Sequence, residues 1–237
     1  MGWALFNKDG FYFVLRWLHL FFGVMWIGHL YYFNFVQGAT MAEADAATKS
    51  GILTKLLPKA MWWFRWGAMW TMVTGVIYLT GKMHQFPSFG AFASSSYGIA
   101  ILSGAILGLT MWANVWFIIW PKQKIVIASA TQVAGGGAAL PEAAKVAPQA
   151  LLASRTNTLF SIPMLFFMGA SSHLPFAVTE TSQLTAMWAI LGLIWAAIQF
   201  NAVKGKLGPI TTIKGVIHCG FALTILMYVV MELCIHA

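Results

Sequence analysis

Long apolar runs, separated by short polar or glycine-rich stretches, are the main pattern along the chain. Six of these runs have enough residues to cross about 30 Å of hydrocarbon at about 1.5 Å per helical residue. Helices are expected, because lipid offers no partner to an unpaired backbone group and the short alternating segments of a membrane barrel are absent. The pattern predicts spans at residues 11–36, 61–81, 97–120, 156–177, 184–203 and 212–234.

The composition indicates a protein embedded in the lipid bilayer. Of the 237 residues, 59% are hydrophobic and only 8% are charged, whereas a soluble domain carries about 25% charged residues. The N-terminal apolar run is too long for a cleavable signal peptide, and no small-residue cleavage site follows it. The predicted fold class is therefore all-α, a polytopic transmembrane helix bundle, with a length that suits a single domain over residues 1–237.

Two of the links between the spans are long. Residues 38–59 include a helix-like stretch, which we expect to lie at the membrane surface. Residues 121–153 contain the small, glycine-rich sequence AGGGAALPEAAKVAPQ, which predicts a flexible segment.

The basic residues predict the orientation of the bundle. One side of the membrane receives only Lys8, Arg16 and Lys82, and the other side receives the remaining 11 of the 14 Lys and Arg residues. The positive-inside rule then places both termini outside, on the periplasmic side of a bacterial inner membrane that the chain crosses several times. Topology thus explains the net charge of +8, and the lack of a compact basic module argues against nucleic-acid binding.

Several classes of chemistry are excluded by the side chains. Glu232 is the only carboxylate within a predicted span, which argues against paired-carboxylate hydrolysis and proton-relay chains. No phosphate-binding loop, zinc-protease, serine-hydrolase or dinucleotide motif occurs. Cys219 and Cys234 lie about 22 Å apart on one predicted helix, too far to form a disulfide with each other. Because C-x-x-C-H is absent, no covalently attached c-type haem is expected in this chain.

The histidines remain as the candidate functional residues. An ionisable side chain inside a membrane is a functional hypothesis by default, and neutral histidine in such helices commonly ligates haem iron. The alternative for each is a hydrogen bond to a backbone carbonyl or a neighbouring helix. The six are His19, His29, His84, His173, His218 and His236, of which His84 and His236 fall at span ends and are expected to be solvated.

Depth along the spans pairs the other four histidines. His19 and His173 fall in the outer half of the bilayer, and His29 and His218 fall near the inner face. His19 and His29 lie about 80° apart around one helix, so they cannot ligate the same iron. We expect one haem b between His19 and His173, and a second haem would use His29 and His218.

Polar residues near these positions extend the hypothesis. Arg16 and Arg65 could bind haem propionates, because guanidinium matches carboxylate geometry. For Arg65 the alternative is an extended side chain that reaches the lipid headgroups. Asn114 falls inside a predicted span and needs a hydrogen-bond partner, which we expect on another helix. The tryptophan-rich segments 61–70 and 111–120 are typical of interfacial anchors.

Several segments resemble the membrane domain of the bacterial membrane-bound urate oxidase (urate hydroxylase, PuuD) family. All of these segments lie outside the last two predicted spans. They are RWLH (16–19), WIG (26–28), YYF (31–33), WFRW (63–66), ANVWFIIWPKQKIVIA (113–128) and IPMLFFMGASSHLP (162–175). The resemblance implies a helical membrane domain, usually of eight spans, followed by a periplasmic cytochrome c domain. It also implies urate oxidation, with electrons passed to that cytochrome. Histidines of the family's membrane domain correspond to His19 and His173 of this chain.

The chain departs from the family pattern in ways that bear on function. It has six predicted spans and no cytochrome domain. Gly67 stands where the family pattern has an acidic residue. Leu102 and Thr156 stand near places where histidines are expected, and His29 falls where the family tends to have serine.

Three functions are therefore open. The first is a haem b membrane protein that passes electrons in or beside a respiratory or oxygenase complex. The second is a urate-oxidising enzyme, an oxidoreductase that works with a separate cytochrome c. The third is a cofactor-free accessory subunit. Expected partners are the lipid bilayer and a cytochrome c or other complex subunits, with a homo-oligomer as an alternative; the sequence identifies no catalytic residue.

The orientation yields a direct test. A cysteine introduced near residue 135, in a link expected on the cytoplasmic side, should stay unmodified when intact cells are treated with an impermeant thiol reagent. Efficient labelling at that position would reverse the orientation.

Overall fold

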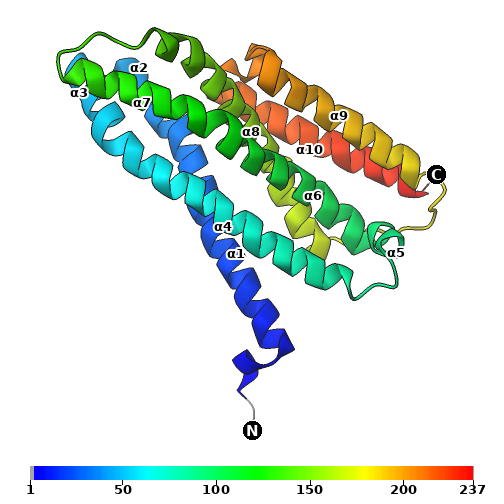
Figure 1. Cartoon of the computed structure of the whole chain (residues 1–237). Coiled ribbons are helices and arrows are strands. Elements are labelled where there is room, and N and C mark those ends of the chain that lie inside the picture. Colours follow the sequence, from blue (N-terminus) through cyan, green and yellow to red (C-terminus); the bar gives the residue numbers. More distant parts are fainter. Residues whose placement is uncertain (1–2, 237) are drawn as a thin grey trace. The chain divides into compact units, whose positions relative to one another are not determined.

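The computed structural model describes residues 3–236, and every regular element in that range is helical (Figure 1). The predicted all-α class is thus confirmed. The chain divides into two compact units, which are described separately. Unit 1 comprises Met1–Gln85 and Val115–Ala150, and unit 2 comprises Phe86–Asn114 and Leu151–Ala237.

Unit 1 is formed mainly by three long helices and the short helices between them. Asn7 caps the first long helix, since its side chain accepts a hydrogen bond from the Gly10 amide at 2.9 Å. Asp45 caps another helix in the same way, with its carboxylate 2.7 Å from the Thr48 amide. The elements are η1 (Ala4–Phe6), α1 (Lys8–Tyr31), π-helical η2 (Tyr32–Gln37), α2 (Gly38–Glu43), α3 (Ala46–Gly51), π-helical η3 (Ile52–Leu56), α4 (Leu57–Met83) and α7 (Trp120–Ala134).

Helices α1 and α4 pack side by side along much of their length (Figure 1). Glycines on α4 permit this approach: a Cβ atom at Gly67 would lie 3.1 Å from the Trp26 backbone nitrogen. Trp26, Phe64 and Ala68 are almost fully buried. Small residues at the contact are the usual device for close helix packing in membranes, where hydrophobic burial does not drive helices together.

Unit 2 is built from four longer helices and two short ones. Two of its elements continue beyond it: π-helical η4 (Asn114–Ile119) begins at its border, and α8 (Pro141–His173) enters it at residue 151. The other elements are α5 (Phe89–Ala93), α6 (Ser96–Ala113), α9 (Leu184–Lys204), η5 (Gly208–Thr211) and α10 (Ile213–His236).

A buried cluster of amide side chains links the C-terminal end of α6 with α8 and α9. Asn114 donates to Asn157 at 2.9 Å and to Gln199 at 3.0 Å, and the Gln199 amide donates back to Asn114 at 2.7 Å. Asn157 also donates to the Met111 carbonyl at 2.9 Å. Asn114 and Asn157 are at most 1% exposed. The predicted hydrogen bond of Asn114 to another helix is therefore confirmed, and Asn114 reaches two.

Among the described residues, four helical segments are long and apolar enough to cross a membrane. Helices α4 and α8 overlap predicted spans but are less apolar and are not among the four. The count of six spans and the orientation therefore stay predictions. The four are Lys8–Glu43, Ser96–Ala134, Leu184–Lys204 and Ile213–His236.

The structure corrects one predicted boundary and shows more helix than expected in one predicted link. Helix α8 ends at His173, whereas the predicted span ran to residue 177; Pro175 explains this, because the residue before a proline disfavours helical dihedrals. Within the link 121–153, the glycine-rich segment expected to be flexible, residues 134–149, is helical except at residues 135–140. The alanines and lysines of this link favour helices on both sides of a turn at Gly136, whose φ is +87°. The prediction of a helix-like stretch at 38–59 is confirmed by α2, α3 and η3.

The amide cluster predicts a stability effect. Asn114→Ala leaves buried groups of Asn157 and Gln199 without partners, so the free energy of unfolding in detergent micelles should fall by about 1–2 kcal/mol. Denaturant titration measures the change. Thr131→Ala, which removes an exposed hydroxyl bonded to its own helix, is the control, and equal losses in both variants would contradict a stabilising role for the cluster.

Candidate functional site

His19 lies at the contact between α1 and α4 and bonds to the backbone of the other helix. Its Nδ1 is 2.9 Å from the Thr71 carbonyl oxygen and 3.4 Å from the Thr74 hydroxyl. A carbonyl oxygen can only accept, so Nδ1 carries the hydrogen and donates it. The Nε2 atom therefore keeps its lone pair, and no described residue hydrogen-bonds to it.

Helix α4 leaves room for this imidazole by having glycine at position 75. A Cβ atom there would lie 2.8 Å from Cε1 of His19 and 3.0 Å from Nδ1. The Thr74 hydroxyl donates to its own helix, at the Trp70 carbonyl, at 2.6 Å. The ring is thus held in one orientation by the carbonyl on one side and the close backbone of Gly75 on the other.

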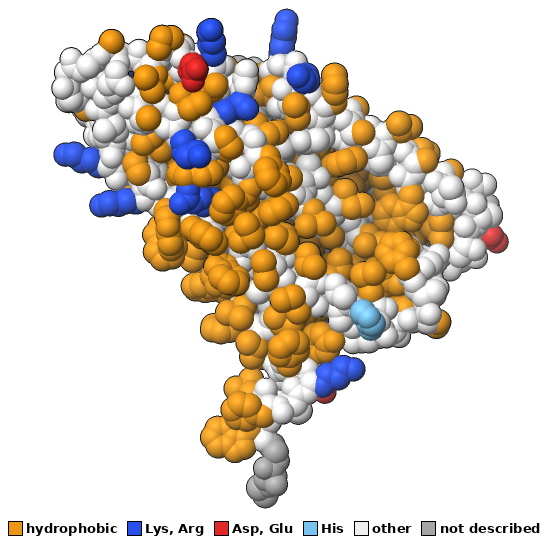
Figure 2. All heavy atoms as spheres, in the orientation of Figure 1, with side chains coloured by type: hydrophobic (Ala, Val, Ile, Leu, Met, Phe, Trp, Pro, Cys, Tyr) orange, Lys and Arg blue, Asp and Glu red, His pale blue; other side chains and the backbone are white. Residues whose placement is uncertain are grey.

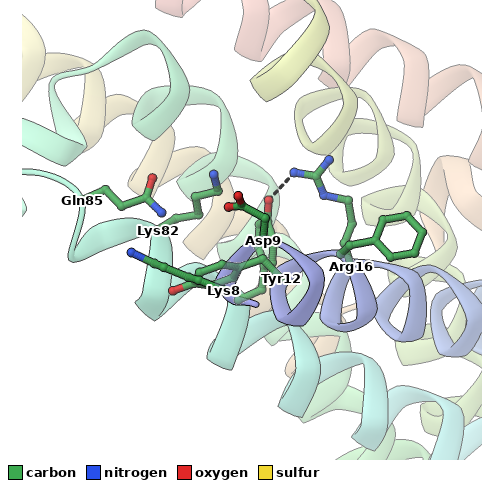
Figure 3. Close-up of a pocket in the computed structure, with 8 residues that line it drawn as sticks. Lys8, Asp9, Tyr12, Arg16, Lys82 and Gln85 are labelled. Carbon is green, nitrogen blue, oxygen red and sulfur yellow. Dashed lines mark hydrogen bonds between the residues drawn. The ribbon is translucent and has the colours of Figure 1, made fainter. Parts of the chain in front are cut away.

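Arg16 and Tyr12 extend this site along α1. Tyr12, Arg16 and His19 are spaced by four and three residues, which places them on one helix face. Arg16 donates to the Tyr78 hydroxyl, drawn as the dashed line in Figure 3, and its guanidinium carbon is 5.2 Å from the centre of that ring. Tyr12 meets Tyr78 edge to face at 5.9 Å.

Tyr12, Arg16 and Tyr78 border a hollow of about 350 Å³ in unit 1, and His19 is not among its lining residues (Figure 3). Three cations and a single carboxylate line this hollow. Among the described residues, the one ion pair closer than 4 Å is formed by other side chains. None of the three cations therefore has a carboxylate within 4 Å. Such a site suits the carboxylate groups of an organic anion. The lining residues are Lys8, Asp9, Tyr12, Phe13, Arg16, Tyr78, Lys82 and Gln85.

His29 is also oriented by a backbone carbonyl, but on its own helix. Its Nδ1 lies 2.7 Å from the Met25 oxygen, one turn back, and its ring centre is 6.2 Å from that of Phe33. The same tautomer argument leaves Nε2 of His29 with a lone pair. This local bond is less specific than that of His19, because any helical histidine in the same rotamer can form it.

His173 and His218 belong to unit 2, and both are exposed. His173 is the last residue of α8, and His218 lies on α10. The predicted pairs combine His19 with His173 and His29 with His218, and both pairings stay predictions. Among the described residues no three His, Cys, Asp or Glu side chains gather as a metal site would require; axial haem ligation needs fewer.

Arg65 stacks on an aromatic ring of unit 1. Its guanidinium carbon lies 3.9 Å from the centre of the Trp120 ring, and the Lys124 ammonium is 5.7 Å from the same centre. The Nε atom of Arg65 is buried without a hydrogen-bond partner among the described residues. The structure thus shows a cation–π contact, while the predicted contact with a propionate stays a prediction.

The other two histidines lie where the sequence places them. His84 and His236 are both exposed, as expected. His84 Nδ1 bonds to the Thr80 carbonyl oxygen at 2.8 Å, and His236 Nε2 is 3.0 Å from the Glu232 carboxylate.

Sequence reasoning missed the residues that orient His19. The Thr71 carbonyl leaves no trace in the sequence, because any residue would supply it. Gly75 was the available signal, since a glycine inside an apolar helix usually has a packing reason. Tyr78, which bonds Arg16, stands among many aromatic residues and was not distinguishable from them.

Comparison with known proteins gives one match. The family described as urate oxidase N-terminal matches residues 83–231, which is well over half of the chain. No curated protein and no solved structure matches it. The match includes the segments 113–128 and 162–175 and extends into the last two predicted spans, where we had assigned no resembling segment. His173 and His218 lie inside the matched region, and the segment that carries Arg16, His19 and His29 precedes it.

The His19 site predicts a coupling between two positions. Gly75→Ala should lower the free energy of unfolding by about 1–3 kcal/mol, because the new methyl group overlaps the imidazole. In a His19→Ala background the same change should become neutral or stabilising, since alanine favours a helix over glycine by about 1 kcal/mol. Denaturant titration of the four proteins measures the coupling.

Gly28→Ala is the matched control, because a Cβ atom there meets nothing within 4 Å. It should be neutral or stabilising in both backgrounds. If Gly75→Ala costs the same with and without His19, the ring does not occupy the position described.

Proposed function

We propose that this chain, which belongs to the urate oxidase N-terminal family, is the membrane-embedded part of a urate oxidase-type oxidoreductase. In this role it binds haem b and passes electrons. Within the family we assign it to the membrane-bound urate hydroxylase branch. We place it in a bacterial inner membrane, crossed by six helices with both termini in the periplasm. A cytochrome c or another subunit of a membrane complex would exchange electrons with it.

The geometry of His19 is the observation that carries the proposal. Histidines that ligate metals usually donate their other ring N–H to a carbonyl or carboxylate, which fixes the tautomer and the ring orientation. His19 has this arrangement, with Nδ1 at 2.9 Å from the Thr71 carbonyl and Nε2 carrying a lone pair. Gly75 leaves space for the ring in this orientation, since a Cβ atom there would lie 2.8 Å from Cε1 of His19.

The charges beside His19 suit the propionate groups of haem b. Arg16 lies about 4.5 Å from His19 along the helix axis and borders the hollow together with Lys8 and Lys82. When bound, haem b supplies a one-electron couple at iron. Three nearby cations would stabilise the more negatively charged, reduced form and so raise its reduction potential. His173 is the proposed second ligand, and His29 with His218 would hold a second haem.

Two positions favour electron transfer over urate chemistry in this chain. Gly67 stands where the family pattern has an acidic residue, and a Cβ atom there would lie 3.1 Å from the Trp26 backbone. A carboxylate side chain does not fit at this position unless α1 moves. Thr156, near an expected histidine, is 1% exposed and bonds the Leu152 carbonyl of its own helix. Gly67 and Thr156 therefore contribute to helix packing. Urate oxidation with a separate cytochrome c is our second candidate function.

Haem content tests the proposal directly. Purified protein should show a reduced b-type absorbance band, and His19→Ala or His173→Ala should lower the haem per chain or convert it from low spin to high spin, because an axial nitrogen is lost. Absorbance spectroscopy with haem extraction measures both. His236→Ala should change neither quantity. Protein without haem, or both alanine variants with a full complement of low-spin haem, would contradict the assignment.

Reduction of cytochrome c separates the two candidate functions. With haem in place, urate should reduce no added ferric cytochrome c if the chain only transfers electrons between other partners. Urate-dependent reduction of cytochrome c that is lost in His19→Ala would favour the second candidate, in which the electrons of urate pass to that cytochrome. A preparation that lacks haem and activity but co-purifies with a membrane complex would point to the accessory subunit.

A further inference from the structure

A second hollow lies at the N-terminal end of α4, in unit 1. It measures about 400 Å³ and is lined by Pro58, Lys59, Trp62 and Trp63. Lys59, Trp62, Trp63 and Trp66 follow the spacing of one helix face. This hollow shares no residue with the His19 site.

The tryptophans form a connected aromatic frame. Trp62 meets Trp63 edge to face, with ring centres 4.7 Å apart, and its centre lies 6.4 Å from that of Trp66. Trp66 in turn packs edge to face on Trp116, at 5.7 Å. Trp62 and Trp63 are nevertheless 46% and 49% exposed. The frame thus holds two broad apolar surfaces in place while leaving them uncovered.

The charge around the hollow is entirely positive. Lys59 is exposed, and so is Lys55 one turn earlier. No acidic residue occurs between Asp45 and Glu142, a stretch that contains the whole of α4 and α7. In the space-filling view, Lys and Arg side chains gather near the α3 end of unit 1, and hydrophobic side chains cover most of the surface along α4 (Figure 2).

We propose that this hollow binds the phosphate of an anionic phospholipid, with Lys59 as the charge partner. The indole rings of Trp62 and Trp63 would lie against the glycerol backbone and the start of the acyl chains. A tryptophan at a membrane interface combines an apolar ring with an N–H that can reach a phosphate or ester oxygen.

A lipid fits better than free phosphate for a physical reason. A small hydrated anion gains nothing from two half-exposed indole rings, whereas a lipid buries them. Farther along α4, Trp70, Val76 and Ile77 are each more than 40% exposed, so an apolar surface continues from the hollow in the direction that acyl chains would take. A zwitterionic lipid would use the same surface but would lose the net charge attraction to Lys59.

The test uses the full chain in detergent micelles and counts bound lipid by native mass spectrometry. The probes are phosphatidylglycerol, phosphatidylcholine with the same acyl chains, and inorganic phosphate. Phosphatidylglycerol should bind most tightly, and Lys59→Ala should weaken it about fivefold, as expected for the loss of one lysine charge at a lipid surface. Lys59→Arg should restore the binding.

Lys145→Ala is the matched control, because it removes the same charge from another exposed lysine of unit 1. It should leave phosphatidylglycerol binding unchanged. Equal weakening in the two alanine variants would overturn the site, because binding would then follow net charge alone. Equal affinity for both lipids, or inorganic phosphate that displaces the lipid at similar concentration, would overturn the choice of occupant. Haem content should not change with Lys59, so failure here leaves the proposed function untouched.

Discussion

The close approach of α1 and α4 is the constraint on which the candidate site depends. Because Gly67 and Gly75 have no side chains, the backbone of α4 comes near enough for a histidine on α1 to reach a carbonyl that belongs to α4. The same approach puts Arg16 beside Tyr78. If α1 and α4 were farther apart by the size of one methyl group, the His19 imidazole would lose its hydrogen bond to the Thr71 carbonyl. Arg16 would then also lie farther from Tyr78.

The sequence predicted helices and their approximate positions well, since lipid forces long apolar runs into helices. It also predicted that Asn114 would find a partner on another helix, because an unpaired amide in such a place is costly. Boundaries were less certain: Pro175 ended α8 early, and the glycine-rich link proved to be two helices joined by a short turn. Composition alone could not show that, because the glycines of this link indicate a loop while its alanines favour a helix.

For the site, the sequence identified the ionisable residues but not what surrounds them. His19 and Arg16 were distinguishable because polar side chains are rare in apolar helices. The Thr71 carbonyl, Gly75 and Tyr78 were not, since backbone atoms carry no residue label and the other two are common in membrane helices. The choice of partner for each histidine depends on tertiary packing, which periodicity and depth along a helix constrain only in one dimension.

The stretch without acidic residues has a consequence for how this part of the protein responds to its surroundings. Between Asp45 and Glu142 the groups that ionise are lysines, tyrosines, one arginine (Arg65) and one histidine (His84). None of these side chains is a carboxylate, so the stretch supplies no acidic partner for its own cations and carries an excess of positive charge. Such a surface concentrates anions from its surroundings, and added salt screens that attraction.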